Sequence, residues 1–279
     1  MPELPEVEIA ARNLRRWLAG KRITRADFPP TRILRKVKSV SLSGKKVKPI
    51  SLSRLVVGRT VEEVARKGKW LRLGLSGGAA LYSHLGMTGK WVERPRASGP
   101  ERYERARLDA GRASVRYLDP RLFGRLIASP DGAPPPEWLA LGDDPLTDGV
   151  DEKRLAERLA RTGRSIKEAL LDQRLLPGVG NIQAAEALWR AKIDPRTPAR
   201  DLDGKRVRAL ARAVEKSIRD TIAREDSPEI TYVEEPGADN LFDVYGKHGR
   251  PCPRCRTKLV RLVQAGRSTV YCPRCQRAA

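Results

Sequence analysis

The first residues of the chain place a potential nucleophile beside acids. The chain begins MPELPEVE, and removal of Met1 would leave the nitrogen of Pro2 as a free secondary amine. Because an α-amine has a reference pKa of about 8, part of it is unprotonated near neutral pH and can attack a sugar carbon, forming an iminium. Glu3 follows within reach of the same reacting centre, and Glu6 adds a second acid. The alternative is a plain helix start, where proline and acids are both favoured.

The four cysteines form two closely spaced pairs near the end of the sequence. Cys252 and Cys255 make one CPRC unit, Cys272 and Cys275 make another, and sixteen residues separate the pairs. This spacing is typical of zinc sites in which each pair turns two thiolates toward one tetrahedral ion. Two disulfides are the alternative, and a reducing cytosol disfavours them. Four protein ligands leave no coordination position open, so we expect one structural Zn²⁺ without a catalytic role.

The charge balance indicates the kind of partner. The formal net charge is +22 and the sequence pI is near 10.4, which favours a polyanion, most simply nucleic acid. The sequence has no apolar run long enough to span a membrane, and its acidic start is unlike a signal peptide. We therefore expect a cytoplasmic protein that binds DNA or RNA.

The first half of the chain reads as one helix followed by strands. Apolar residues repeat at helical spacing over residues 3–19, and Gly20 ends the pattern, so a packed helix would hold the terminal amine in place. Over residues 22–127 short alternating runs predict an antiparallel sandwich or barrel. The basic run over 32–48 reads as irregular and exposed. The strongest strand candidates are Thr60–Val64, Trp70–Leu75, Ala79–His84 and Ala113–Leu118.

The second half reads as helices followed by the cysteine segment. Residues 130–149 are rich in Pro, Gly and Asp, which predicts a linker. Residues 227–240 read as a loop that leads into the cysteines. The helix candidates between these segments are Glu157–Ala160, Ile166–Asp172, Ile182–Ala191 and Val207–Ile222.

Several glycine-containing turns could contact a ligand. In LPGVGN two glycines precede a helix, whose free N–H groups, with Asn181, would suit a DNA phosphate; an ordinary helix–helix turn is the alternative. HLGMTG and DPRLFG each carry an apolar residue on a turn, Met87 and Phe123, and enzymes that extrude a base use such wedges together with an arginine. Lys69 in RKGKWL begins a strand and, taken alone, reads as a surface charge.

Seven motifs in one order resemble those of a single family. The set PELPEVE, RKGKWL, HLGMTG, DPRLFG, LPGVGNIQAAEAL, VYGKHGRPC and GRSTVYCPRCQ is similar to the bacterial formamidopyrimidine-DNA glycosylase family and spans the whole chain. The resemblance implies a bifunctional base-excision repair enzyme that removes oxidised purines such as 8-oxoguanine and formamidopyrimidines from duplex DNA. It also implies that the abasic site is then nicked by β,δ-elimination.

The resemblance implies catalytic roles for five residues. Pro2 would be the nucleophile at the sugar C1′, and Glu3 the acid that helps open the ribose and shuttles protons. Glu6 would be a supporting acid, Lys69 the strand lysine near the phosphate and lesion, and Arg267 the arginine of the finger hairpin.

The resemblance implies DNA-binding roles for five more. Met87, Arg121 and Phe123 match the residues that fill the void left by the flipped base. His84 stands beside them in the HLGM turn, and Asn181 matches a phosphate contact of the helix-two-turn-helix motif.

The sequence also departs from the family pattern. Leu122 stands where a second basic residue is usual, so one phosphate or strand contact is in doubt. Trp70 stands where tyrosine is common. The segment 225–240 is shorter than usual, which puts the preference for 8-oxoguanine over formamidopyrimidines in doubt. The basic segment 31–48 has no assigned role.

We therefore predict an α+β protein. An N-terminal antiparallel β-sandwich with its helix covers 1–130, a linker 131–150, a helical domain with the helix-two-turn-helix 151–240, and a four-cysteine zinc-finger β-hairpin 241–279. The protein is expected to act as a monomer on damaged double-stranded DNA at the bacterial nucleoid. Two alternatives stay open: an endonuclease VIII-type enzyme for oxidised pyrimidines, disfavoured because that branch usually begins Pro-Glu-Gly-Pro, and a non-catalytic zinc-dependent DNA-binding protein.

Overall fold

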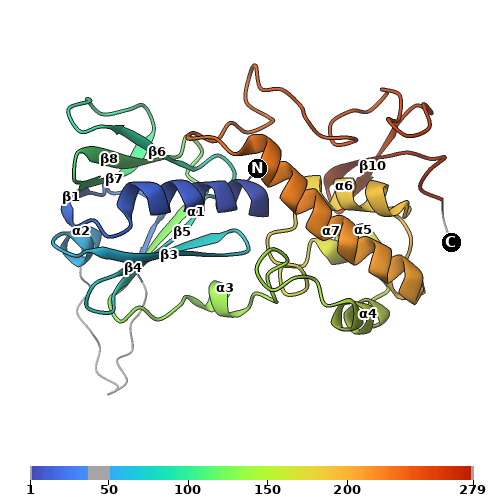
Figure 1. Cartoon of the computed structure of the whole chain (residues 1–279), viewed down its shortest axis with the longest axis horizontal. Coiled ribbons are helices and arrows are strands. Elements are labelled where there is room, and N and C mark those ends of the chain that lie inside the picture. The colour runs from blue at the N-terminus through green and yellow to red at the C-terminus, as the bar shows by residue number, and fades with distance from the viewer. Residues whose placement is uncertain (1, 37–50, 278–279) are drawn as a thin grey trace. The chain divides into compact units, whose positions relative to one another are not determined.

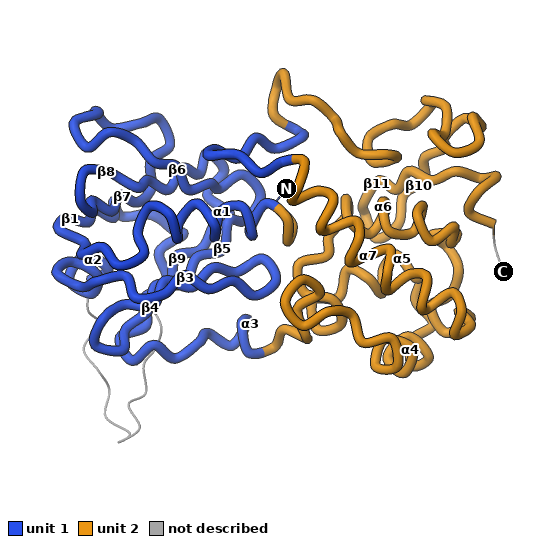
Figure 2. The backbone as a smooth tube through the Cα atoms, viewed as in Figure 1, with its two compact units in different colours: residues 1–2, 6–139, 225–234 blue, residues 3–5, 140–224, 235–279 orange. Residues whose placement is uncertain are grey.

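The computed structural model describes residues 2–36 and 51–277. The chain forms two compact units (Figure 2). The first holds the described residues of Met1–Pro2, Glu6–Leu139 and Glu225–Glu234; the second holds those of Glu3–Pro5, Ala140–Arg224 and Glu235–Ala279. Two short segments, Glu3–Pro5 and Glu225–Glu234, are therefore grouped with a different unit from their sequence neighbours on one side, and the first contains the candidate acid Glu3.

The first unit is a sandwich of two sheets (Figure 1). One sheet has the strand order β1-β7-β8-β6 and the other β2-β9-β5-β4-β3. The pairs are antiparallel except that β2 lies parallel to β9. The strands are β1 (Ile23–Asp27), β2 (Leu34–Lys36), β3 (Val61–Lys67), β4 (Trp70–Leu75), β5 (Ala80–His84), β6 (Lys90–Pro95), β7 (Glu104–Ala110), β8 (Ala113–Leu118) and β9 (Arg125–Ser129).

The four strand candidates are all confirmed, as β3, β4, β5 and β8. The basic segment was predicted to be irregular, and this is wrong for Leu34–Lys36, which hydrogen-bonds to β9. Ile33 just before it is buried in the core, which explains the strand. The rest of that segment, 37–50, lies outside the described residues. A short helix, α2 (Leu52–Val56), follows it.

Helix α1 (Leu4–Leu18) confirms the predicted N-terminal helix. Its apolar residues from Val7 to Leu18 belong to the same core cluster as both sheets. Its orientation is also fixed by charge, because Glu8 pairs with the buried guanidinium of Arg66 on β3 at 2.8 Å. A buried charge that loses its partner costs several kcal/mol, so this pair constrains how the helix can rotate.

The segment Glu225–Glu234 packs on the first unit although it follows the helices of the second. Ile230 and Tyr232 are buried in the sandwich core, and the Tyr232 hydroxyl donates to the carbonyl of Gly89 at 2.6 Å. The Asn13 side chain of α1 donates to the carbonyl of Ser227 at 2.8 Å. Residues 227–240, which were predicted to be a loop, contain no helix or strand.

The second unit contains the predicted helices. The capping side chains fit their starts: Asp151 accepts from the first turn of α4, and Ser165 and Glu168 form a capping box on α5. Their apolar faces share one core, which also includes Leu4. The elements are α4 (Glu152–Ala160), α5 (Ile166–Leu170), α6 (Asn181–Ala191), a 3₁₀ turn (Ala199–Asp201) and α7 (Gly204–Glu225). The short helix α3 (Pro136–Leu139) lies within the predicted linker and belongs to the first unit.

The finger hairpin consists of β10 (Val260–Gln264) and β11 (Arg267–Tyr271) in antiparallel register. Ala265 and Gly266 form its two-residue turn, both with positive φ, as tight hairpins require. Among the described helices, none is both long and apolar enough to cross a bilayer.

Candidate active site and zinc centre

The Glu3 carboxylate is held at the start of α6. It accepts backbone N–H groups from Gly180 at 3.0 Å, Ile182 at 2.8 Å and Gln183 at 2.9 Å, and the side chain is buried. The N-terminus of a helix favours a negative charge, and here this charge is supplied by the chain itself. The prediction that these N–H groups are free for a DNA phosphate is therefore wrong. The GVGN turn instead fixes the acid that follows Pro2.

The same turn also fixes the backbone next to Glu3. The N–H of Leu4 donates to the carbonyl of Gly178 at 3.0 Å. Gly178 has φ of +84°, and a Cβ there would lie 2.5 Å from the Leu4 Cβ, so only glycine fits. Gln173 braces the turn: its Oε1 accepts the Gly178 N–H and its Nε2 donates to the carbonyl of Val179, both at 2.9 Å. A chain end that would ordinarily fray is thereby held.

Lys167 lies at the centre of the polar groups in the second unit. It is 1% exposed, and its Nζ donates to the Asn181 Oδ1 at 2.6 Å and also to the Thr269 hydroxyl on β11. Burial lowers the pKa of Lys167 to about 8; the negative charge of Glu3 opposes this effect and Arg267 adds to it. Three predicted residues, Glu3, Asn181 and Arg267, therefore interact with a lysine that no sequence motif indicated.

Asn181 links α6 to the finger hairpin. Its Nδ2 donates to the carbonyl of Ser268 at 3.0 Å, while its Oδ1 accepts from Lys167. Arg267 precedes Ser268, is exposed, and is paired in register with Gln264 next to the turn. The hairpin tip is thus held at a fixed position beside the start of α6, with a cation facing solvent.

In the first unit, His84 ends β5 beside Lys69. Its ring makes an edge contact with Trp70, with centroids 4.9 Å apart, and its Nδ1 accepts the N–H of Gly86 at 3.0 Å. Burial, together with the charges of Lys69 and Arg125, lowers the pKa of His84 to about 4. The imidazole is therefore neutral at pH 7, with Nε2 carrying its proton.

The two turns with the predicted wedge residues lie against each other. A Cβ on Gly86 would lie 2.4 Å from the carbonyl carbon of Phe123, so HLGM and DPRLFG touch backbone to backbone. Phe123 is 47% exposed, and the guanidinium carbons of Arg121 and Arg32 lie 5.0 and 5.7 Å from its ring centroid. Met87 is half-buried on the adjoining turn. An exposed aromatic ring under two cations can stack on bases.

Asp119 holds the DPRLFG turn in shape. It is buried, and its carboxylate accepts the backbone N–H groups of Arg121, Leu122 and Gly124 and the hydroxyl of Thr88. Leu122 has φ of +57° and packs its side chain on the sandwich core. The usual basic residue is thus replaced by one that anchors the turn.

The predicted catalytic residues are distributed over both units. Pro2 and Glu6 are buried in the first unit, which also holds Lys69. Glu3 and Arg267 lie in the second.

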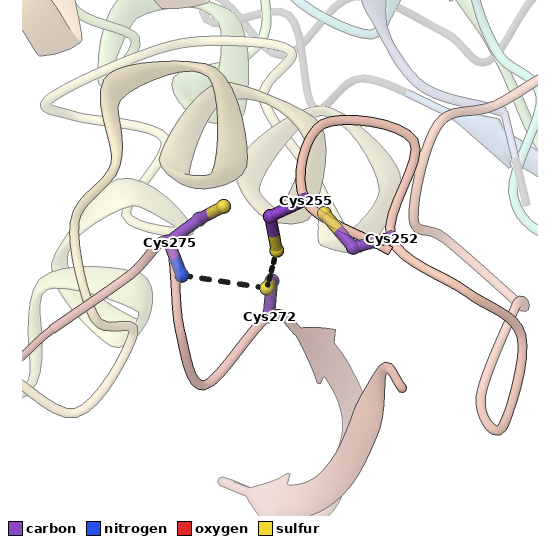
Figure 3. A group of neighbouring side chains, drawn as sticks. All are labelled: Cys252, Cys255, Cys272 and Cys275. Atoms are coloured by element: carbon purple, nitrogen blue, oxygen red, sulfur yellow. Dashed lines mark hydrogen bonds between the residues drawn. The ribbon is translucent and has the colours of Figure 1, made fainter. Parts of the chain in front are cut away.

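The four cysteines converge on one point (Figure 3). None forms a disulfide, and all four sulfurs lie within 4.8 Å of one another. Zinc–sulfur bonds of about 2.3 Å in a tetrahedron place sulfurs about 3.8 Å apart, so the donor set fits one zinc ion. The second CPRC turn is closed by Gln276, whose Oε1 accepts the N–H of Cys272 at 2.8 Å. The site is the predicted structural zinc centre.

Comparison with known proteins agrees with this geometry. Three family models match in chain order: the formamidopyrimidine-DNA glycosylase N-terminal domain over residues 1–126, its H2TH domain over 141–231, and the zinc finger found in FPG and IleRS over 249–278. A formamidopyrimidine-DNA glycosylase of Roseiflexus sp. (strain RS-1) is 39% identical and is covered completely by 99% of this chain.

Two solved structures extend the comparison to the fold. The MutM (Fpg) protein of Thermus thermophilus is 34% identical, with a TM-score of 0.81 and 100% of both chains covered. The Lactococcus lactis FPG (MutM) in complex with DNA containing FAPY-dG is 28% identical, with a TM-score of 0.84 over 99% of this chain and 100% of that one.

Proposed function

This chain belongs to the formamidopyrimidine-DNA glycosylase family, and we propose that it removes oxidised purines from duplex DNA and then nicks the abasic site. The observation that carries the proposal is the Glu3 carboxylate, which three backbone N–H groups at the start of α6 hold next to Pro2. A surface helix start would not need its first acid buried and braced. A catalytic dyad of amine and acid does need it, because a misplacement of 1 Å can cost about 100-fold in rate.

The first chemical step uses the Pro2 nitrogen, after Met1 has been removed. The amine attacks C1′ of the lesion sugar, the bond from C1′ to the base breaks, and the base leaves with the electron pair and takes up a proton. Glu3 assists by protonating the ring oxygen as the sugar opens. The product is an iminium that joins Pro2 to the sugar.

The lyase steps follow from the iminium. Loss of the C2′ proton expels the 3′ phosphate, and a second elimination expels the 5′ phosphate. Water then hydrolyses the iminium and frees the amine. The gap carries a phosphate at each end.

The other residues bind and deform the DNA. Phe123, Arg121 and Met87 fill the space of the extruded base, which offsets the few kcal/mol that extrusion costs. Lys69, Asn181 and Arg267 contact phosphates; Asn181 and Arg267 are positioned around Lys167. Such contacts release counterions, so affinity should fall steeply with salt. We expect a monomer with one structural zinc ion that acts on chromosomal DNA.

The proposal is tested by incision of duplexes that carry one lesion each: 8-oxoguanine, a formamidopyrimidine or an oxidised pyrimidine. We expect faster cutting of the purine lesions and 3′- and 5′-phosphate ends in the product. Faster cutting of the oxidised pyrimidine would overturn the substrate assignment, and binding without incision would overturn the enzymatic one.

A further inference from the structure

An indole N–H points at one of the zinc ligands. Trp189, on α6, donates its Nε1–H to the sulfur of Cys252 at 3.4 Å. The Trp189 side chain belongs to a helix that lies outside the finger, and both residues are buried, at 8% and 0% exposure. Because a buried indole N–H needs a partner, this bond is a built feature of the packing.

Arg254 of the first CPRC turn contacts the same indole. The guanidinium carbon of Arg254 lies 4.3 Å from the Trp189 ring centroid, and its Nη1 donates to the Trp189 carbonyl at 3.1 Å. Trp189 and Cys252 also share an apolar cluster with Val244, Leu259 and Val270. Trp189 is therefore held by three contacts: Arg254 on the face of its ring, Cys252 at its N–H, and the Arg254 Nη1 at its backbone carbonyl.

The second CPRC turn is tied to the end of the same helix. Gln276 accepts the N–H of Cys272 and donates its Nε2 to the carbonyl of Ile193 at 2.9 Å, two residues past α6. Both CPRC turns thus contact the C-terminal end of α6, whose first residue is Asn181, or the residues just after it. Their two attachments differ, since only the first reaches a sulfur atom.

The negative charge of the zinc centre explains why the hydrogen bond from Trp189 to Cys252 would stabilise it. Four thiolates and one Zn²⁺ carry a net double negative charge in a partly buried site. An N–H donor to a sulfur disperses this charge and orients the ligand, and such outer contacts commonly change metal affinity by about 10–100-fold.

We propose that Trp189 is an outer-sphere residue of the zinc centre, which contacts the ligand Cys252 rather than the metal. Its N–H stabilises the metal-bound thiolate, and its ring fastens the finger to α6. Zinc retention therefore depends on a residue outside the finger. This inference concerns the metal site alone and does not rest on the glycosylase activity.

The first test measures zinc release. In Trp189→Phe one six-membered aromatic ring remains, while the N–H is lost with the five-membered ring that carries it; Trp138→Phe makes the same change in the first unit. Zinc competition against a chromogenic chelator should show affinity about tenfold or more weaker for Trp189→Phe and unchanged for Trp138→Phe. Equal affinity in both variants would overturn the proposal.

The second test needs no variant to fold. In the full wild-type chain loaded with ¹¹³Cd, the Trp189 indole proton, assigned by its NOEs to Cys252, should show scalar coupling to the metal through the N–H···S bond. A merely structural contact gives no such coupling. Its absence in a folded, loaded protein would contradict the proposal even if Trp189→Phe lost zinc by unfolding.

Discussion

Leu4 and Gly178 are joined by a backbone hydrogen bond of 3.0 Å, and the Leu4 side chain occupies the space where a Gly178 side chain would be. The start of α1 is thereby locked to the turn that also binds Glu3. The geometry of the proposed nucleophile thus depends on a glycine far away in the sequence.

Gly178→Ala should therefore displace the N-terminus. A left-handed alanine costs about 1–2 kcal/mol, and the clash with Leu4 adds about 1–3 kcal/mol. We expect a loss of about 2–5 kcal/mol in the free energy of unfolding, measured in urea, and a rate about 100-fold lower in protein that is still folded.

Gly237→Ala provides the matched control. Gly237 has φ of +82° in the same unit, but a Cβ there meets nothing within 4 Å. It should lose only the backbone part, about 1–2 kcal/mol, and keep full activity. Equal effects of the two substitutions would mean that the contact with Leu4 has no importance.

Replacement of Lys167 should separate stability from function. Lys167→Met removes a buried cation whose pKa of about 8, against 10.5, shows that burial disfavours its charged form. We expect the free energy of unfolding at pH 7 to stay within about 1 kcal/mol of the wild type. Incision should fall at least about tenfold, because the Asn181 Oδ1 loses its hydrogen-bond donor and the side chain is held only by the Ser268 carbonyl.

The control for that prediction is Lys216→Met, an exposed lysine paired with Asp220 on α7. Lys216→Met should change neither the free energy of unfolding nor the rate of incision. If Lys167→Met kept full incision activity, the cluster around Lys167 would be structural only.

How much of this site the sequence could reveal depends on where each partner lies. The zinc ligands and α1 were predicted because their signals are local: a cysteine spacing and a helical period. The partner of the α6 N–H groups is Glu3, 177 residues before Gly180, and no local pattern carries that pairing. The sequence of a helix start is the same whether its free N–H groups bind a phosphate or a carboxylate from elsewhere in the chain.

Lys167 was missed for a similar reason. Its sequence neighbours, Ser165 and Glu168, carry only a helix-capping signal. What makes it unusual is burial by Thr269 on the hairpin, 102 residues later. The segment Glu225–Glu234 likewise showed only loop composition, although Tyr232 anchors it in the first unit.

His84 should make the stability of the protein depend on pH. Its pKa is about 4 in the folded state and 6.5 when unperturbed, so the unfolded chain binds the proton more tightly. The stability that the protein gains from keeping His84 neutral is fully present above pH 6.5 and is lost as the pH falls toward 4. The difference between the two pKa values corresponds to roughly 3 kcal/mol in the free energy of unfolding.

The measurement compares the wild type with His84→Gln by urea unfolding at several pH values. The stability advantage of the wild type should shrink by about 2–3 kcal/mol between pH 7 and pH 4.5. A constant difference, or one that grows on acidification, would show that His84 is not buried in its neutral form.

Phe123 should act on base extrusion and hardly on stability. Because Phe123 is 47% exposed, Phe123→Ala should cost less than about 1 kcal/mol of stability. Base removal from an 8-oxoguanine duplex should slow by about tenfold or more, since stacking on an aromatic ring is worth about 1–3 kcal/mol.

A duplex with a preformed abasic site distinguishes the wedge from general DNA binding. With no base to extrude, its nicking by Phe123→Ala should be affected much less. Leu139→Ala, also exposed at 66%, should leave both reactions unchanged. Equal slowing on the two duplexes would refute a role in extrusion.

The central claim is that the Pro2 nitrogen is the atom that reacts. Borohydride reduction during the reaction with an 8-oxoguanine duplex, followed by peptide mass spectrometry, locates the trapped sugar directly. The account predicts that the sugar remnant lies on the N-terminal peptide, on the nitrogen of a Pro2 from which Met1 has been removed. A remnant on Lys69 or Lys167, or an active protein that retains Met1, would contradict it.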